Sequence, residues 1–166
     1  MSMTLESLAR ACREVLAGND TPAGREQVAA LIAQALRDPE FVAAQFPPGA
    51  PERKVLYEDP VLGFCILAHE YGGAKESGPH DHGPSWAIYG QAEGETLMSD
   101  FALVKAATPE TRGKVRPVRS YALKPGDVHV YNEGDLHAPA RLAATRLIRV
   151  EGINMDRVKR LKYEVA

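Results

Sequence analysis

Residues 78–90 read Gly78-Pro79-His80-Asp81-His82-Gly83-Pro84-Ser85-Trp86-Ala87-Ile88-Tyr89-Gly90, a turn-rich loop that leads into a strand-like run. Residues i and i+2 of a strand face the same side, so His80 and His82 can direct both imidazoles at one point. Two converging neutral imidazoles are a common start of a site for zinc, iron, nickel or copper. A solvated turn with two exposed histidines is the plain alternative, so the other ligands must come from elsewhere in the chain.

The composition is that of an ordinary globular protein, and the small net charge produces no strong electrostatic field. Its 166 residues, 45% of them hydrophobic and 25% charged, fit one domain with a real core. A net charge of −2 and a pI near 6.2 favour neither nucleic acid nor an anionic membrane as a partner. Several basic residues alternate with apolar ones and so fit strand faces better than a binding stripe: Lys114, Arg116, Arg119, Arg141, Arg146 and Arg149.

The two cysteines and the N-terminal residues indicate the cellular compartment in which the protein is expected. Cys12 and Cys65 lie in a helical and a strand pattern, which suggests no disulfide framework. The first sixteen residues carry four charges and no apolar core of a secretion signal, and no apolar run approaches the roughly 18 residues that span a bilayer. A cytoplasmic protein is therefore expected.

Residues 1–50 are predicted to form a helical segment packed on the rest of the chain. A 3–4 spacing of apolar residues runs from Leu5 to Leu16, and Gly18-Asn19-Asp20 interrupts it. Thr21-Pro22 and Asp38-Pro39 each combine a capping residue with proline at the first helical position, so two further helices are expected to begin there.

Residues 51–166 are predicted to form a β-domain. Short apolar runs alternate with turn signals, and about eight strands at this rhythm imply a sandwich or barrel. The expected strands are Arg53–Glu58, Leu62–Glu70, Ser85–Tyr89, Glu95–Ala106, Val115–Leu123, Val128–Tyr131, His137–Leu142 and Arg146–Glu151. Gly90 to Gly94 is expected to separate two of them. Residues 155–160 are read as a turn of helix and residues 161–165 as an edge strand.

The third histidine of a metal site has three candidates, His69, His129 and His137. His137 follows the run Lys124-Pro125-Gly126-Asp127-Val128-His129-Val130-Tyr131-Asn132-Glu133-Gly134-Asp135-Leu136-His137. Here the chain resembles the cupin superfamily (RmlC-like), whose first motif contains HxH and a closing glycine and whose second contains a Pro-Gly-Asp turn and G-x2-H. The resemblance implies a double-stranded β-helix (jelly-roll barrel), mainly β. The N-terminal helical segment is expected to cover one mouth or face of it.

The resemblance implies His80, His82 and His137 as the metal ligands. Gly94 matches the closing glycine of the first motif, and Gly134 begins the G-x2-H of the second. His129 remains an alternative ligand or a neighbour that supports the ligands, and His69 is interpreted as structural.

The cupin motif's glutamate is missing, because Trp86 and Ala87 stand where it belongs. Three neutral imidazoles leave the metal its full charge and more open positions for substrate. Within the superfamily this resembles the three-histidine thiol dioxygenases, the cysteine dioxygenase-like enzymes. The resemblance implies ferrous iron, one divalent ion per chain, with nickel or zinc possible in purified protein, and it implies dioxygen and a small thiol or similar anionic metabolite as substrates. A metal-dependent isomerase or lyase and a small-ligand-binding module remain alternatives.

Several further residues are candidates for a role beside the metal. The resemblance implies an arginine for the substrate carboxylate, for which Arg53 is the nearest match; Arg149, with Arg146, is the alternative clamp, and exterior strand positions are the plain reading of both. Tyr89 and Tyr131 flank the two motifs and can hydrogen-bond a metal-bound ligand or serve as core residues. Trp86 is expected to wall the pocket or to pack in the core, and a homodimer is possible by analogy with cupins.

Overall fold

The structure is a computed structural model and describes residues 2–166. Three helices come first, α1 (Leu5–Gly18), α2 (Pro22–Leu36) and α3 (Pro39–Gln45). Thr21 caps α2 by accepting a hydrogen bond from the Gly24 N–H, and Asp38 caps α3 by accepting from the backbone N–H groups of Glu40 and Phe41. Both helix starts predicted from Thr-Pro and Asp-Pro are therefore confirmed.

The rest of the chain is mainly β-structure. Its strands are β1 (Arg53–Glu58), β2 (Cys65–Tyr71), β3 (Lys75–Glu76), β4 (Ala87–Glu93), β5 (Thr96–Lys105), β6 (Gly113–Leu123), β7 (Val128–Tyr131), β8 (Leu136–Arg141), β9 (Thr145–Glu151) and β10 (Tyr163–Val165). All eight predicted strands are present, with ends that differ by a few residues, and the predicted helical turn is a short 3₁₀ helix, Met155–Arg157.

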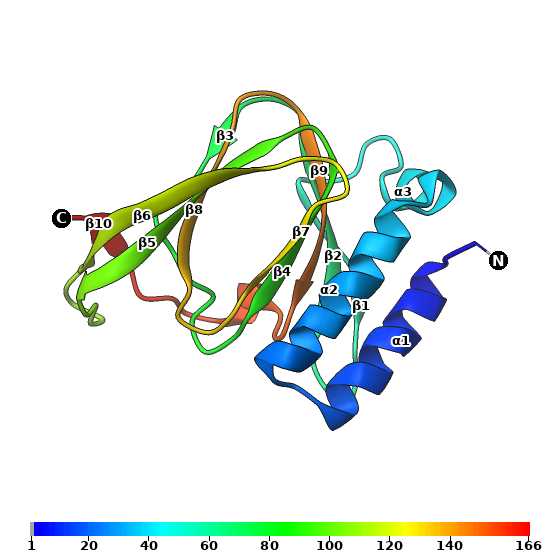
Figure 1. The fold of residues 1–166 in the computed structure, drawn as a ribbon, viewed down its shortest axis with the longest axis horizontal. Helices are drawn as coiled ribbons and strands as arrows, with labels where there is room; N and C mark the ends of the chain where they lie inside the picture. Colours follow the sequence, from blue (N-terminus) through cyan, green and yellow to red (C-terminus); the bar gives the residue numbers. More distant parts are fainter. Residues whose placement is uncertain (1) are drawn as a thin grey trace.

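The strands form two five-stranded sheets that face each other. One has the order β1-β2-β9-β4-β7 and the other β10-β6-β5-β8-β3, so the chain passes repeatedly from one sheet to the other. Pairing is antiparallel throughout except between β10 and β6, which run parallel. This strand order is that of a double-stranded β-helix, or jelly roll, and it confirms the predicted fold class. Figure 1 shows the two sheets curling around a common interior, with the helices outside.

Two predictions about strands were wrong. β3 was missed because it has only two residues, too few to show an alternating pattern. Gly90 was taken as a separator, but it lies inside β4. Its role is packing: a Cβ at Gly90 would lie 2.7 Å from Ile32 Cγ2 and 3.1 Å from Leu36 Cδ1, so only glycine lets α2 approach the strand this closely.

Side chains alternate along β4 between two separate cores. Ile88 faces outward into a cluster shared with α1 and α2, whereas Ala87 and Tyr89 face the interior between the sheets. The helices thus cover the outer face of the β1-β2-β9-β4-β7 sheet and leave the interior to other side chains (Figure 1).

Ile32 joins α2 to the sheet and offers a direct test of this layer. It is fully buried, so Ile32→Ala is expected to lower the free energy of unfolding by about 2–5 kcal/mol through lost contacts and a residual cavity. Urea unfolding followed by circular dichroism measures the change. Leu142→Ala is the control, because Leu142 is 91% exposed and its loss should change stability by less than about 0.5 kcal/mol. Equal losses for the two variants would contradict the packing described.

Residues 154–166 form a segment that we call the C-terminal strap. It leaves β9, passes through the 3₁₀ helix and ends in β10, which lies beside β6 in the second sheet (Figure 1). Arg160 Nη1 on the strap donates to the backbone oxygen of Asp81, in the loop that carries two of the predicted ligands (3.3 Å). No helix within residues 2–166 is long and apolar enough to cross a membrane.

Candidate metal centre

Two separate chain segments bring the predicted ligands together. His80 and His137 form an isolated antiparallel bridge: the N–H of each donates to the carbonyl oxygen of the other, both at 2.9 Å. His82 lies in the loop before β4, where Asp81 Oδ1 accepts from the Gly83 N–H. His80 and His82 converge as predicted, but not by regular strand alternation, because only His80 makes a bridge and the loop turns at Gly83, whose φ is +60°.

Backbone carbonyls fix the orientation of two of the rings. His80 Nδ1 lies 2.9 Å from the Gly78 oxygen, and His137 Nδ1 lies 2.9 Å from the Asp135 oxygen. A carbonyl can only accept, so each Nδ1 carries the proton and each Nε2 keeps a free lone pair. Such support of the far ring nitrogen is the usual arrangement around metal-binding histidines.

The free nitrogens converge on one point. Candidate ligand atoms of His80, His82 and His137 all lie within 4.8 Å of one another, and His82 Nε2 is 3.3 Å from His137 Nε2. Two nitrogens bound at about 2.0–2.1 Å in tetrahedral geometry stand roughly 3.3 Å apart, so this spacing fits a transition metal. Within residues 2–166 no carboxylate joins the group. An all-imidazole donor set suits zinc, copper, iron or nickel rather than magnesium or calcium.

Burial keeps these imidazoles in the neutral form that a metal requires. Loss of hydration lowers the pKa of His80 to about 4 and is the largest cause of a lowered pKa at His82 and His137 as well. The rings also oppose one another's protonation: His137 lowers the pKa of His82, and His80 lowers that of His137. The cluster is therefore uncharged at neutral pH.

His129 and His69 do not belong to this group. The His129 ring packs against Tyr131, with centroids 4.5 Å apart, and Tyr131 in turn stacks on His137 at 4.1 Å. His69 is buried in β2, where its Nδ1 faces the Tyr71 hydroxyl at 3.2 Å. Neither has an atom in the three-histidine cluster.

The two candidate tyrosines differ in what their hydroxyls contact. The Tyr89 hydroxyl lies 3.1 Å from His82 Nε2 and 3.2 Å from His137 Nε2, at the point where the ligand nitrogens converge. Burial raises the pKa of Tyr89, so the hydroxyl keeps its proton at neutral pH. The Tyr131 hydroxyl instead pairs with that of Tyr121 at 2.7 Å, and its ring supports His137. Tyr89 can contact a ligand of the metal, and Tyr131 can position a histidine.

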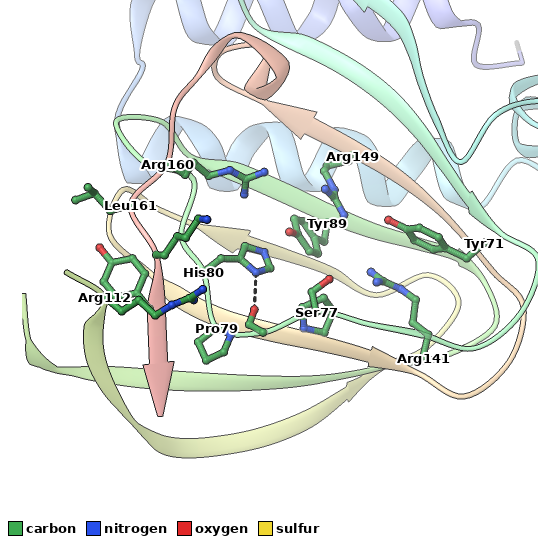
Figure 2. Close-up of a pocket in the computed structure, with 14 residues that line it drawn as sticks. Tyr71, Ser77, Pro79, His80, Tyr89, Arg112, Arg141, Arg149, Arg160 and Leu161 are labelled. Atoms are coloured by element: carbon green, nitrogen blue, oxygen red, sulfur yellow. Dashed lines mark hydrogen bonds between the residues drawn. The ribbon is translucent and has the colours of Figure 1, made fainter. Parts of the chain in front are cut away.

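A cavity of about 440 Å³ opens beside the cluster. His80 and Tyr89 form part of its wall, and five cationic side chains complete much of the rest: Arg112, Arg141, Arg149, Arg160 and Lys162. No aspartate or glutamate is among its fourteen lining residues. Figure 2 shows Arg141 and Arg149 directed toward the space beside Tyr89, with Arg112 and Arg160 nearer His80. The cavity is suited to a small anion.

The predicted arginines fall in three different places. Arg149 lines the cavity, with its guanidinium 4.1 Å above the Tyr89 ring. Arg146 was wrongly paired with it: Arg146 lies on the opposite face of β9, where it bonds Glu70 and Glu93. Arg53 is held by Glu151, Asn154 and Asp156 and does not line the cavity. Trp86 is also absent from the cavity wall and packs among the helix-side core.

Arg141 was not singled out as a site residue. It follows His137 by four positions in the same strand, so the two side chains share a face, and that alternation could have revealed it. The cationic residues of the C-terminal strap had no comparable signal, because only the parallel β10–β6 pairing brings them to the cavity.

Strand order and donor set together define a double-stranded β-helix protein with a candidate metal centre. Solved structures with this fold are similar to the chain. They include a cupin superfamily protein from Desulfitobacterium hafniense (14% identity, 63% of this chain and 83% of that chain, TM-score 0.43) and KdgF from Halomonas sp. (16%, 68% and 91%, 0.46). A third is an uncharacterised protein with a double-stranded β-helix domain from Klebsiella pneumoniae (16%, 74% and 95%, 0.47). At these identities the similarity concerns the fold alone.

A scan against protein-family models finds no match to the chain, and a search of curated proteins also finds none.

Proposed function

We propose that the chain is a metal-dependent cupin enzyme, a dioxygenase that oxidises a small anionic thiol at ferrous iron held by His80, His82 and His137. The observation that carries the proposal is the convergence of three neutral imidazoles, with no carboxylate, beside a cationic cavity. A dication held by neutral ligands keeps its full charge and leaves open positions for further ligands. Bound ferrous iron supplies neighbouring positions at which a thiolate and dioxygen can meet.

The proposed reaction balances without an external reductant. Both atoms of dioxygen are added to the thiolate sulfur, so R–S⁻ and O₂ give the sulfinate R–SO₂⁻. Sulfur loses four electrons and dioxygen gains four. The chain therefore needs to bind two substrates and one metal, and no second cofactor is required.

The residues around the cluster have distinct tasks in this proposal. The protonated Tyr89 hydroxyl donates a hydrogen bond toward the reacting atoms, since it lies within 3.2 Å of two ligand nitrogens. Arg149 attracts the anionic end of the substrate into the cavity. The carbonyls of Gly78 and Asp135 hold the His80 and His137 rings toward the metal.

Oxygen uptake tests the proposal. Protein reconstituted anaerobically with Fe(II) is expected to consume one O₂ per sulfinate formed with cysteine or 3-mercaptopropionate. It should be much less active with cysteamine, which has a positive charge and no carboxylate for the cationic cavity. An oxygen electrode and mass spectrometry of the product measure both quantities. The zinc-loaded protein is the control, because zinc has no redox chemistry.

Two outcomes would reject this function. Absence of oxygen uptake with all three thiols would exclude the thiol dioxygenase. Turnover of a substrate under argon by the zinc-loaded protein would point instead to Lewis-acid chemistry, as in an isomerase or lyase.

A further inference from the structure

Arg141 is a buried cation without a carboxylate partner. It is 3% exposed, and within residues 2–166 its guanidinium has one hydrogen-bond partner, the Thr96 hydroxyl, which accepts from Nε at 3.2 Å. Its Nη2 is buried with no partner, and its guanidinium carbon lies 4.8 Å above the Tyr71 ring. Burying an uncompensated charge is costly, so the fold keeps here a group that destabilises it unless an anion binds.

Arg149 is a second cation whose partners leave it incomplete. It is 9% exposed, its Nε is buried without a partner, and its nearest carboxylate oxygen, Glu151 Oε2, lies 3.8 Å from Nη1. Glu151 is already occupied, since it accepts two hydrogen bonds from Arg53 and one from the Met155 N–H. The Glu151 carboxylate is therefore shared by Arg53 and Arg149, and Arg141 has no carboxylate partner.

The two arginines face the same space. Both line the cavity and point toward the region beside Tyr89 (Figure 2). The positive charge of Arg149 contributes to the lowered pKa of Arg141, after loss of hydration, so the two charges oppose each other across this space. A group with one negative charge would compensate only one of them.

We propose that Arg141 and Arg149 together bind a group with two negative charges on closely spaced oxygen atoms, such as a phosphoryl group or a dicarboxylate. Both guanidinium groups line the cavity, and their N–H groups donate to these oxygens. Arg112, Arg160 and Lys162 at the same cavity add positive charge that attracts the group. The inference rests on the proposed function only in taking this cavity as the substrate site. It predicts that a thiol with a dianionic end remote from the sulfur is a better substrate than cysteine or 3-mercaptopropionate, which have one carboxylate each.

Anion binding to the metal-loaded protein tests this site. Inorganic phosphate, malonate and acetate are titrated by calorimetry, and phosphate or malonate is expected to bind at least about tenfold more tightly than acetate. Arg141→Met should weaken that binding by about tenfold or more. Arg157→Met is the matched control and should bind as wild type does, because Arg157 is exposed and pairs with Glu58 outside the cavity. Phosphate alone would identify a phosphoryl group, and malonate alone a dicarboxylate.

Thermal unfolding gives a second readout that needs no ligand affinity. Without added anion, Arg141→Met should melt at a higher temperature than wild type, because a buried charge is replaced by an apolar side chain of similar length. Phosphate should raise the midpoint of wild type and not that of the variant. Acetate binding as tightly as phosphate and malonate, or binding of these anions that is unaffected by Arg141→Met, would overturn the proposal.

The metal itself can attract anions, and a ligand variant separates that effect. Binding that is lost in His137→Ala but kept in Arg141→Met would belong to the metal and would overturn the arginine site. Anion binding that depends on Arg141, in a protein that oxidises no thiol, would instead reject the proposed function and leave this site in place.

Discussion

His137→Ala is expected to weaken metal binding by more than about 100-fold and to abolish oxygen uptake. Losing a group that only orients a ligand already costs 10–100-fold in affinity, and His137 supplies a donor nitrogen itself. Its Nε2 lies 3.3 Å from that of His82, so removal leaves two donors. Elemental analysis after dialysis against a weak chelator should fall from about one ion per chain in wild type to near zero.

His129→Ala is the matched control for this prediction. His129 lies in the same sequence run as His137, but it has no atom in the three-histidine cluster. The variant should keep about one ion per chain. Unchanged metal content in His137→Ala, or loss of metal in His129→Ala, would refute the ligand set whichever reaction the protein catalyses.

The metal-free protein is expected to lose much of its stability between pH 7.5 and pH 5. His80, His82 and His137 all have a lowered pKa in the folded state, His80 to about 4, from a usual 6.5. Below pH 6.5 these histidines bind protons in the unfolded chain but not in the folded chain. The free energy of unfolding therefore decreases as the pH is lowered, until the folded groups themselves protonate near or below pH 4. By pH 5 each histidine accounts for about 2 kcal/mol, and three for roughly 6 kcal/mol, if they titrate independently.

Such a loss is comparable to the whole stability of many domains, about 5–15 kcal/mol. Urea unfolding at a series of pH values measures it. In His137→Gln one of the three groups is gone, so the fall between pH 7.5 and pH 5 should be smaller by about 2 kcal/mol. An equal fall in the variant and in wild type would show that the pH dependence arises elsewhere.

Local signals in the sequence predicted most of the fold. Capping residues followed by proline located the starts of α2 and α3, and alternation located eight strands. The errors arose where a non-local contact decides. Gly90 resembles a turn residue, but it lies inside β4 because α2 packs against it. No feature of residues 85–94 alone reveals that helix.

The candidate site was only partly predictable for the same reason. Two motifs pointed to His80, His82 and His137, which the fold brings together. Arg146 and Arg149 are three residues apart on β9, so their side chains lie on opposite faces of the strand. Arg149 lines the cavity, whereas Arg146 faces outward and bonds Glu70. The sequence did not predict that the C-terminal strap lines the cavity, because the parallel pairing of β10 with β6 is a long-range contact with no local sequence signal.

The site joins two segments that lie far apart in the sequence, so metal binding also contributes to the stability of the fold. A metal held by His82 and His137 would act as a cross-link across 55 positions of sequence. The unfolded chain does not hold the two histidines together, so the ion binds the folded state and its binding free energy adds to the free energy of unfolding. The ion would therefore stabilise the contact between the loop before β4 and strand β8, which lie far apart in the sequence and are slow to meet during folding.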